Sequence, residues 1–188
     1  MEKHKLFAFV GPSQAGKTTI IRELLKVMPD ELEEALSLTT RPRRGAEDDG
    51  TYRFISADKL LEKQAAGKLI QIIEYAGYSY ANDRDEMDRL LKRSHGLIAL
   101  TEQGVRNFLD AKYEVVVIRV IPVDYQATSD EARVRADEAR AKLSITVHIE
   151  VLNSFSPGGL ESAVEELTRL IKRAIAKPPP APAPPPQT

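Results

Sequence analysis

The sequence predicts an α/β fold in which a parallel sheet is covered by helices on both faces. Short apolar runs typical of buried strands alternate along the chain with segments whose apolar residues recur at helical spacing. A glycine-rich turn joins the first of these strands to the first helix. Such alternation is the pattern of βαβ units, and the length of 188 residues allows one domain with a sizeable core.

The individual elements follow from the same spacing. The first expected strand is the β-prone run Lys5–Val10, and the first expected helix is Lys17–Val27. Ser56 and Gly67 have the residue types that cap the two ends of the next helix. Further strands are expected at Leu69–Ile73, Leu97–Leu100, Val115–Ile121 and Val147–Leu152, and further helices at Ala57–Ala66, Asp85–Arg93, Glu102–Leu109 and Leu160–Ala176.

Composition narrows the classes of partner. The formal net charge is −1, so we expect no general attraction to nucleic acid or to an anionic membrane. The chain has no cysteine, which excludes disulfides and thiolate metal sites. Its first apolar run is too short for a signal peptide and no run approaches a membrane span, so a cytoplasmic protein is expected. Residues 177–188 are proline-rich and predict a disordered tail, at most a weak site for a protein partner.

The turn GPSQAGKTT, starting at Gly11, fits the pattern G-x-x-x-x-G-K-[ST] in full. Backbone N–H groups of such a turn surround a phosphate, the lysine neutralises the β- and γ-phosphate oxygens, and the hydroxyl residue binds Mg²⁺. We therefore expect a site for ATP and Mg²⁺, with Lys17 also catalytic and Thr18 the metal ligand. The residues expected at this site are Gly11, Ser13, Ala15, Gly16, Lys17, Thr18 and Thr19.

A second polar cluster, SLTTRPRRGAEDDGTYRF, begins at Ser37. Three arginines lie within four positions here, and arginine forks suit a phosphate dianion. The tyrosines of GYSYAND, from Gly77, could donate further hydrogen bonds. From the residues alone, a phosphate site and a solvated charged loop both stay open.

These stretches, together with EQGV, resemble the guanylate kinases in the same order and at similar spacing, over roughly residues 5–175. The resemblance implies a P-loop NTPase three-layer fold within residues 1–176, a monophosphate-binding segment inserted at 37–84 and a lid at 122–142. It implies that two arginines and two tyrosines hold the acceptor phosphate. They correspond to Arg41, Arg44, Tyr52 and Tyr80.

The base-reading positions implied by the resemblance are Ser37, Gln71, Asn82 and Thr101. Ser37 agrees with the family, whereas Gln71 and Thr101 stand where the family has carboxylates. Ala99 replaces a family aspartate that helps to organise Mg²⁺. Because carboxylates accept hydrogen bonds from guanine better than neutral groups do, the reading of guanine is altered.

The lid, PVDYQATSDEARVR from Pro122, is shorter than that of the family by roughly ten residues, and the gap falls where transition-state arginines normally lie. Arg135 corresponds to an arginine kept after the lid and is expected to be catalytic. Arg133 and Arg140 are weaker substitutes, better explained as the solvated face of a helix.

The expected function is ATP-dependent phosphoryl transfer to a phosphorylated acceptor, with GMP as the default by resemblance. Two alternatives stay open. The acceptor could be another compound such as a ribose phosphate, because the base-reading carboxylates are missing. The chain could also be a weakly active or inactive module that binds a nucleotide or a protein partner, although the intact Lys17-Thr18 pair argues against it.

Overall fold

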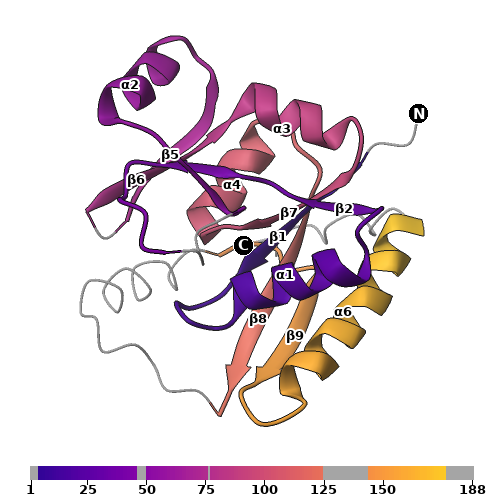
Figure 1. Ribbon diagram of the computed structural model, residues 1–188. Coiled ribbons are helices and arrows are strands. Elements are labelled where there is room, and N and C mark those ends of the chain that lie inside the picture. Colours follow the sequence, from indigo (N-terminus) through magenta and orange to yellow (C-terminus); the bar gives the residue numbers. More distant parts are fainter. Residues whose placement is uncertain (1–3, 46–49, 76, 125–143, 177–188) are drawn as a thin grey trace, which may run out of the picture.

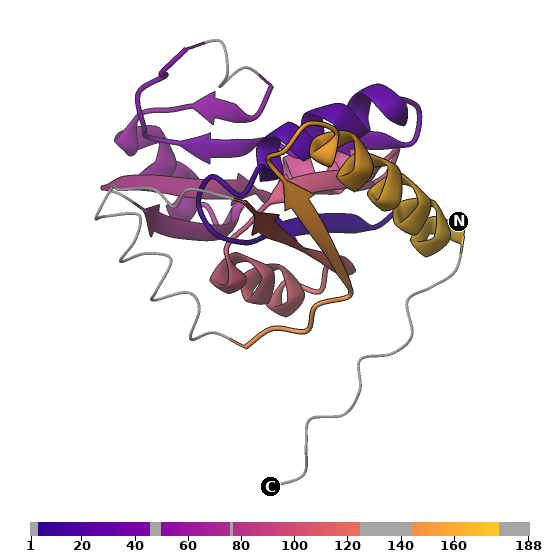
Figure 2. The same cartoon turned by 90° about the horizontal axis from the view of Figure 1, so that it is seen from below.

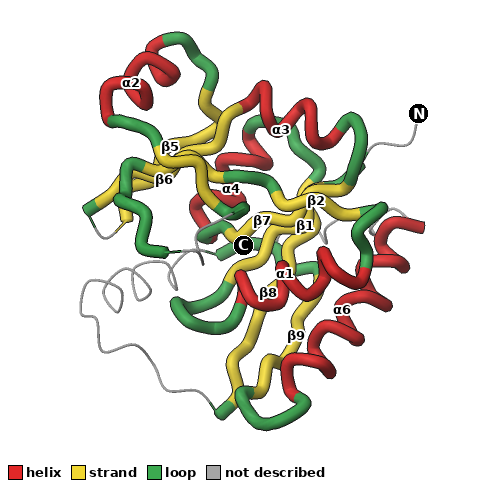
Figure 3. Tube along the Cα trace, in the orientation of Figure 1, coloured by secondary structure: helices red, strands yellow, loops and turns green. Residues whose placement is uncertain are grey.

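The computed structural model describes residues 4–45, 50–75, 77–124 and 144–176. Two sheets organise these residues, one of five strands in the order β2-β7-β1-β8-β9 and one of four in the order β4-β3-β6-β5 (Figures 1 and 3). The first sheet forms the core of the molecule. The second projects beside it together with helix α2, between Ser37 and Asp83.

The five-stranded sheet is parallel at every strand pair. Its central strand β1, Leu6–Val10, has no exposed residue and pairs with β7 on one side and β8 on the other. A strand buried on both faces needs a continuous apolar run, as LFAFV is. The strands beside it and at the edges are β7 His95–Ala99, β8 Val115–Val123, β2 Leu32–Glu34 and β9 Ile149–Ser154.

Helices cover both faces of this sheet (Figure 2). Helices α1, Lys17–Val27, and α6, Gly159–Ala176, pack on the face that carries Phe7 and Phe9. Helices α3, Arg84–Leu91, and α4, Glu102–Asp110, pack on the opposite face. The predicted α/β class with a parallel central sheet is therefore confirmed. None of the helices in the described part of the chain is long and apolar enough to cross a membrane.

The four-stranded sheet has one apolar and one polar face. Leu38, Ile72 and Ala81 lie on the face covered by Leu60 of α2, Ala57–Ala65. Because side chains alternate along a strand, their neighbours point to the other face, which carries the polar residues of the predicted acceptor site. The strands are β3 Ser37–Thr39, β4 Tyr52–Phe54, β5 Leu69–Tyr75 and β6 Tyr78–Asp83.

The predicted elements all occur, with ends that differ by up to two residues. Strand β9 is shifted by two residues from the prediction, because it pairs with β8 as far as Val123 and Ser154. The prediction of Ser56 as the α2 N-cap is confirmed, since its hydroxyl accepts from Lys59 N at 3.3 Å. Gly67 follows the helix with a φ of +65°. Strands β2, β3, β4 and β6 were not predicted.

His148 links β8 to the start of β9 in a way that depends on pH. Its Nδ1 accepts a hydrogen bond from Val117 N at 3.0 Å, which a proton on that nitrogen would prevent. Burial lowers the pKa of His148, so its neutral form stabilises the fold. This contribution is complete above the unfolded-state pKa of about 6.5 and is lost as pH falls through the lower folded-state pKa.

We therefore predict that the free energy of unfolding of the wild type falls as the pH is lowered below about 6.5. In His148→Asn, whose amide oxygen can accept from Val117 without titrating, this fall should be shallower. Urea unfolding at a series of pH values measures both slopes. Equal slopes in the two proteins would show that His148 does not couple pH to stability.

Candidate functional site

The glycine turn between β1 and α1 lies against two neighbouring strands. Gly11 and Gly16 have φ values of +141° and +89°. A Cβ on Gly11 would meet the carbonyl oxygen of Val120 in β8 at 2.6 Å, and a Cβ on Gly16 would overlap Asn153 Nδ2 in β9. Both positions thus require glycine for their backbone angles and for their lack of a side chain.

The end of α1 that opens from this turn is suited to an anion. Gly16 is the N-cap, no side chain caps the helix, and no acidic residue occupies its first turn. The first N–H groups and the positive end of the helix dipole are therefore available to a phosphate. Lys17 Nζ lies over the loop and donates to the carbonyl oxygens of Gly11 and Pro12 at 2.8 and 2.7 Å.

Asn153 supports the loop from β9. It is only 3% exposed, and its Nδ2 donates to Ala15 O at 2.9 Å. Its buried Oδ1 has no hydrogen-bond partner in the described part of the structure. A second support comes from the other sheet, because the Ser13 hydroxyl hydrogen-bonds Tyr75 Oη of β5 at 2.9 Å. The loop thus touches the sheet expected to bind the acceptor.

The loop fits an ATP triphosphate and its metal, but the protein offers little to the metal itself. Thr18 is half-buried beside Lys17 and supplies one hydroxyl. Ala99, at the end of the neighbouring strand β7, adds no carboxylate. Within the described residues there is no group of three His, Cys, Asp or Glu side chains that could hold a metal. These groups suit Mg²⁺ carried by nucleotide phosphates and water, which is how Mg²⁺ is often bound.

Arg41 and two tyrosines meet on the polar face of the four-stranded sheet. Arg41 is 5% exposed, and its guanidinium carbon lies 5.3 Å from the centre of the Tyr52 ring. The Tyr52 and Tyr80 rings are 5.9 Å apart. Arg41 also donates to Pro42 O at 3.0 Å. Ring contacts thus join three of the four predicted clamp residues, whereas Arg44, close to Arg41 in sequence, has an exposed side chain.

A cavity of about 530 Å³ adjoins this cluster. Its lining includes the cations Arg41, Arg43 and Lys59, and none of the described residues that line it carries a carboxylate. Thr40 and Ser56 line the same cavity. A concave surface with this charge favours an anionic ligand.

The predicted base-reading residues form a buried hydrogen-bonded row. Gln71 Nε2 donates to Asn82 Oδ1 at 2.7 Å, and Asn82 Nδ2 donates to Ser37 Oγ at 3.0 Å. Gln71 and Asn82 are 8% and 2% exposed. Thr101 is the N-cap of α4 and accepts from Gly104 N at 3.0 Å. The structure thus brings three of these residues together directly, with Thr101 on the adjacent helix.

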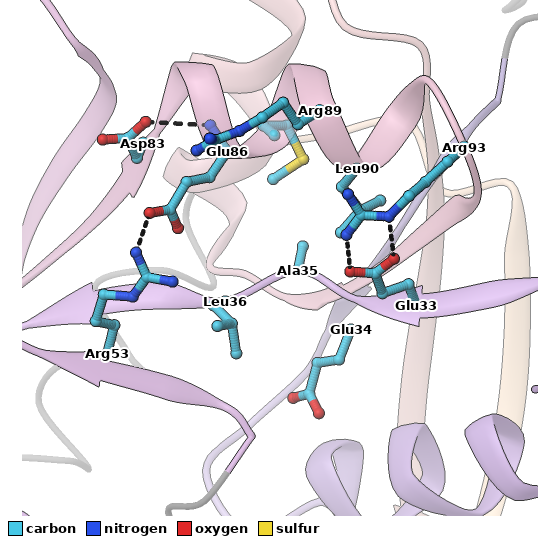
Figure 4. A pocket seen from close by; sticks show the side chains of 11 residues that line it. Glu33, Glu34, Ala35, Leu36, Arg53, Asp83, Glu86, Arg89, Leu90 and Arg93 are labelled. Atoms are coloured by element: carbon cyan, nitrogen blue, oxygen red, sulfur yellow. Dashed lines mark hydrogen bonds and ion pairs between the residues drawn. The ribbon is translucent and has the colours of Figure 1, made fainter.

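A second cavity, of about 420 Å³, lies between β2 and α3 (Figure 4). Ion pairs between Glu33 and Arg93 and between Arg53 and Glu86 border it. Burial raises the pKa of Glu34 in its wall. Burial also acts to raise the pKa of Asp83, but hydrogen bonds from Lys63 and the α3 backbone outweigh it and hold that pKa below its usual range. Asp83 therefore anchors α3 and α2 as a charged group.

Two contacts in the site were not predicted. Asn107 of α4 donates to Gln71 Oε1 at 3.1 Å, and Tyr75 reaches Ser13 as described above. Neither residue belongs to a recognisable motif, and each enters the site through the packing of separate elements. Arg135, Arg133, Arg140 and most of the predicted lid at 122–142 lie outside the described residues, as does the proline-rich tail.

Comparison with known proteins agrees with this arrangement. Residues 3–156 match the family model described as guanylate kinase. A guanylate kinase of Chlamydia felis is 30% identical over 73% of this chain and 68% of its own, and one of Thermotoga maritima is 29% identical over 93% and 89%. The crystal structure of guanylate kinase from Anaplasma phagocytophilum has the same fold, with a TM-score of 0.74 at 19% identity over 95% of this chain and 89% of that one.

The contact at Gly16 predicts an effect beyond backbone strain. In Gly16→Ala the new methyl group overlaps Asn153, whereas in Gly158→Ala, at a φ of +81°, it meets nothing within 4 Å. Both changes should cost about 1–2 kcal/mol for the left-handed backbone, and Gly16→Ala a further ~1–3 kcal/mol for overlap. Urea unfolding measures the free energy of unfolding of each variant, and titration with an ATP analogue measures its affinity for the nucleotide. Equal stability of the two variants would contradict the assigned contact.

Proposed function

Because the chain belongs to the guanylate kinase family, we propose that it transfers the γ-phosphoryl group of ATP to the phosphate of a nucleoside monophosphate. Members of this family are nucleoside monophosphate kinases that use ATP with Mg²⁺. One observation carries the proposal for this chain. The phosphate loop and the polar face of the four-stranded sheet adjoin each other, joined by the hydrogen bond between Ser13 and Tyr75.

On the donor side, the loop residues bind the β- and γ-phosphates. The N–H groups at the start of α1 supply hydrogen bonds, and Lys17 exchanges the carbonyl oxygens of Gly11 and Pro12 for phosphate oxygens. Thr18 is positioned to hold Mg²⁺ with the nucleotide. When bound, the metal neutralises charge on the transferring group.

On the acceptor side, Arg41 and the tyrosines Tyr52 and Tyr80 bind the monophosphate. A guanidinium that is almost fully buried and stacked on an aromatic ring is held in place before the ligand arrives. Arg44 is exposed next to it and adds a second cation when the acceptor is present. Such positioning and charge neutralisation supply most of the catalysis in phosphoryl transfer.

The reaction needs no covalent enzyme intermediate. An oxygen of the acceptor phosphate attacks the γ-phosphorus of ATP, and the bond from that phosphorus to the β–γ bridging oxygen breaks. The products are ADP and the nucleoside diphosphate. Arg135 stabilises the charge of the transferring group in this proposal, as the sequence resemblance implies.

The experiment is an ADP-release assay with ATP and Mg²⁺ against GMP, other nucleoside monophosphates and ribose 5-phosphate. Lys17→Ala should lower kcat by about 10²-fold or more, because no other described side chain of the loop is cationic. Lys26→Ala is the matched control, since Lys26 pairs with Glu23 on the exposed side of the same helix. ATP binding without turnover of any acceptor would favour the alternative of a nucleotide-binding module.

Tyr80 provides a test of the acceptor clamp, with Tyr113 as the matched control. Tyr80→Phe removes the hydroxyl of the ring that packs on Tyr52, and should raise the KM for the acceptor about five- to tenfold with a smaller effect on the KM for ATP. Tyr113→Phe, whose hydroxyl bonds Asp88 outside the four-stranded sheet, should change neither by more than about twofold. An unchanged acceptor KM in Tyr80→Phe would remove Tyr80 from the clamp.

A further inference from the structure

The polar face of the four-stranded sheet places its functional groups in a linear order. The order starts at Tyr75, the last residue of β5, which contacts the phosphate loop. Two residues back along β5, Ile73 pairs with Tyr80 of the clamp. Two residues further, Gln71 pairs with Asn82. Each step of two residues spans about 7 Å, so the phosphate loop, the clamp residues and the amide groups follow one another along the strand.

The amide groups at the end of this order belong to one relay of four hydrogen bonds. Gln103 Nε2 donates to Asn107 Oδ1 at 2.9 Å, and Asn107 Nδ2 donates to Gln71 Oε1 at 3.1 Å. From Gln71 the relay continues through Asn82 to the hydroxyl of Ser37. Every member is uncharged, and the buried pair Gln71–Asn82 lies at its centre.

The direction of the relay determines what the site offers to a ligand. Each amide donates towards Ser37, whose oxygen accepts the last bond, so the Ser37 hydrogen is available to donate. The oxygen of Thr101 likewise accepts from Gly104 N, which leaves its hydrogen available. Gln71 Oε1 retains one further lone pair. This end of the site therefore offers hydroxyl donors and one neutral acceptor.

Among the described strand residues that form this part of the site, none carries a carboxylate. The strand residues on the polar face are hydroxyl, amide, aromatic or aliphatic: Ser37, Thr39, Tyr52, Phe54, Gln71, Ile73, Tyr75, Tyr78, Tyr80 and Asn82. On α4, Gly104 packs against the Gln71 amide. Glu102 is two residues from Gly104 and so lies on nearly the opposite side of the helix.

We propose that the acceptor's base presents a carbonyl oxygen beside a ring N–H and carries no exocyclic amine, as in hypoxanthine and uracil. This inference rests on the proposed phosphoryl transfer to a nucleoside monophosphate. The carbonyl oxygen accepts from the hydroxyls of Ser37 and Thr101, and the ring N–H donates to Gln71 Oε1. Gln71 and Thr101 contact the base, and Asn107 is a positioning residue that fixes the Gln71 amide.

Guanine fits these groups less well. Its N1–H and 2-amino group are adjacent donors that a carboxylate, with two acceptor oxygens, would bind together. Here the amide supplies one acceptor oxygen, so the 2-amino group is left with only the weaker acceptors of the hydroxyl groups. We therefore expect IMP or UMP to bind at least about tenfold more tightly than GMP.

The test is calorimetric titration of the full chain, with Mg²⁺ and a non-hydrolysable ATP analogue present, against IMP, UMP, GMP and ribose 5-phosphate. Tighter binding of IMP than UMP identifies a purine site, and the reverse a pyrimidine site, and either supports the proposal. Binding of GMP at least as tight as that of both, or equal binding of ribose 5-phosphate, overturns it. The titration measures binding and the ADP-release assay measures turnover. Tighter binding of IMP or UMP without turnover of any acceptor would contradict the proposed phosphoryl transfer but would support the base preference.

Two variants restore a carboxylate and should shift the preference towards GMP. Thr101→Asp keeps a residue that caps helices well, and Gln71→Glu places the charge at the centre of the relay. Each should improve GMP relative to IMP by about tenfold, with thermal unfolding confirming that the variant is folded. Gln64→Glu, on the exposed surface of α2, makes the same change of charge outside the relay and should leave the ratio unchanged. A folded Thr101→Asp protein with the wild-type ratio would overturn the proposal.

Discussion

The close approach of β8 and β9 to the turn after β1 is the constraint on which the site depends. Val120 and Asn153 occupy the space that side chains at Gly11 and Gly16 would need. The turn can lie there because the strands of the parallel sheet end at one edge, with β8 paired to β1 and β9 paired to β8. Burial of β1 thus fixes where α1 begins and where its N–H groups point. The anion site is a consequence of sheet packing.

The four-stranded sheet solves a different problem, because it must be stable and still expose a binding surface. Its apolar face is closed by α2 through Leu38, Leu60 and Ala81. Its polar face is stabilised instead by hydrogen bonds, which run from α4 to β3 through Gln71 and Asn82. Buried amides that bond to one another hold a unique geometry, so the same bonds that stabilise this face also set its chemistry.

Much of this molecule could be predicted from its sequence where the signal is local. The run Leu6–Val10, the glycine turn and the helix Lys17–Val27 carry their own periodicity and motif, and the helix was predicted to the residue. Strands β3 and β4 have three residues each and mixed polarity, so they have no readable period and are fixed only by pairing with each other and with β6.

The site divides in the same way. Lys17, Arg41 and Tyr80 were predicted because they belong to motifs, and the resemblance of those motifs placed Gln71 and Asn82 as well. Asn107 and Tyr75 could not be predicted, because their partners Gln71 and Ser13 are 36 and 62 residues away in sequence. Only the packing of α4 on β5, and of the second sheet against the loop, creates these contacts.

In the proposed function, the hydrogen bond between Ser13 and Tyr75 links the two substrate sites thermodynamically. A triphosphate that draws on the Ser13 hydroxyl has to compete with Tyr75, and an acceptor that shifts β5 moves the group to which Ser13 is bound. Linkage is reciprocal, so the free-energy cost of breaking this bond falls on whichever substrate binds first, and the second substrate binds without that cost. Through this one bond, either substrate would bind more weakly when it binds first than when it binds second. The total free energy of binding both substrates is the same for either order.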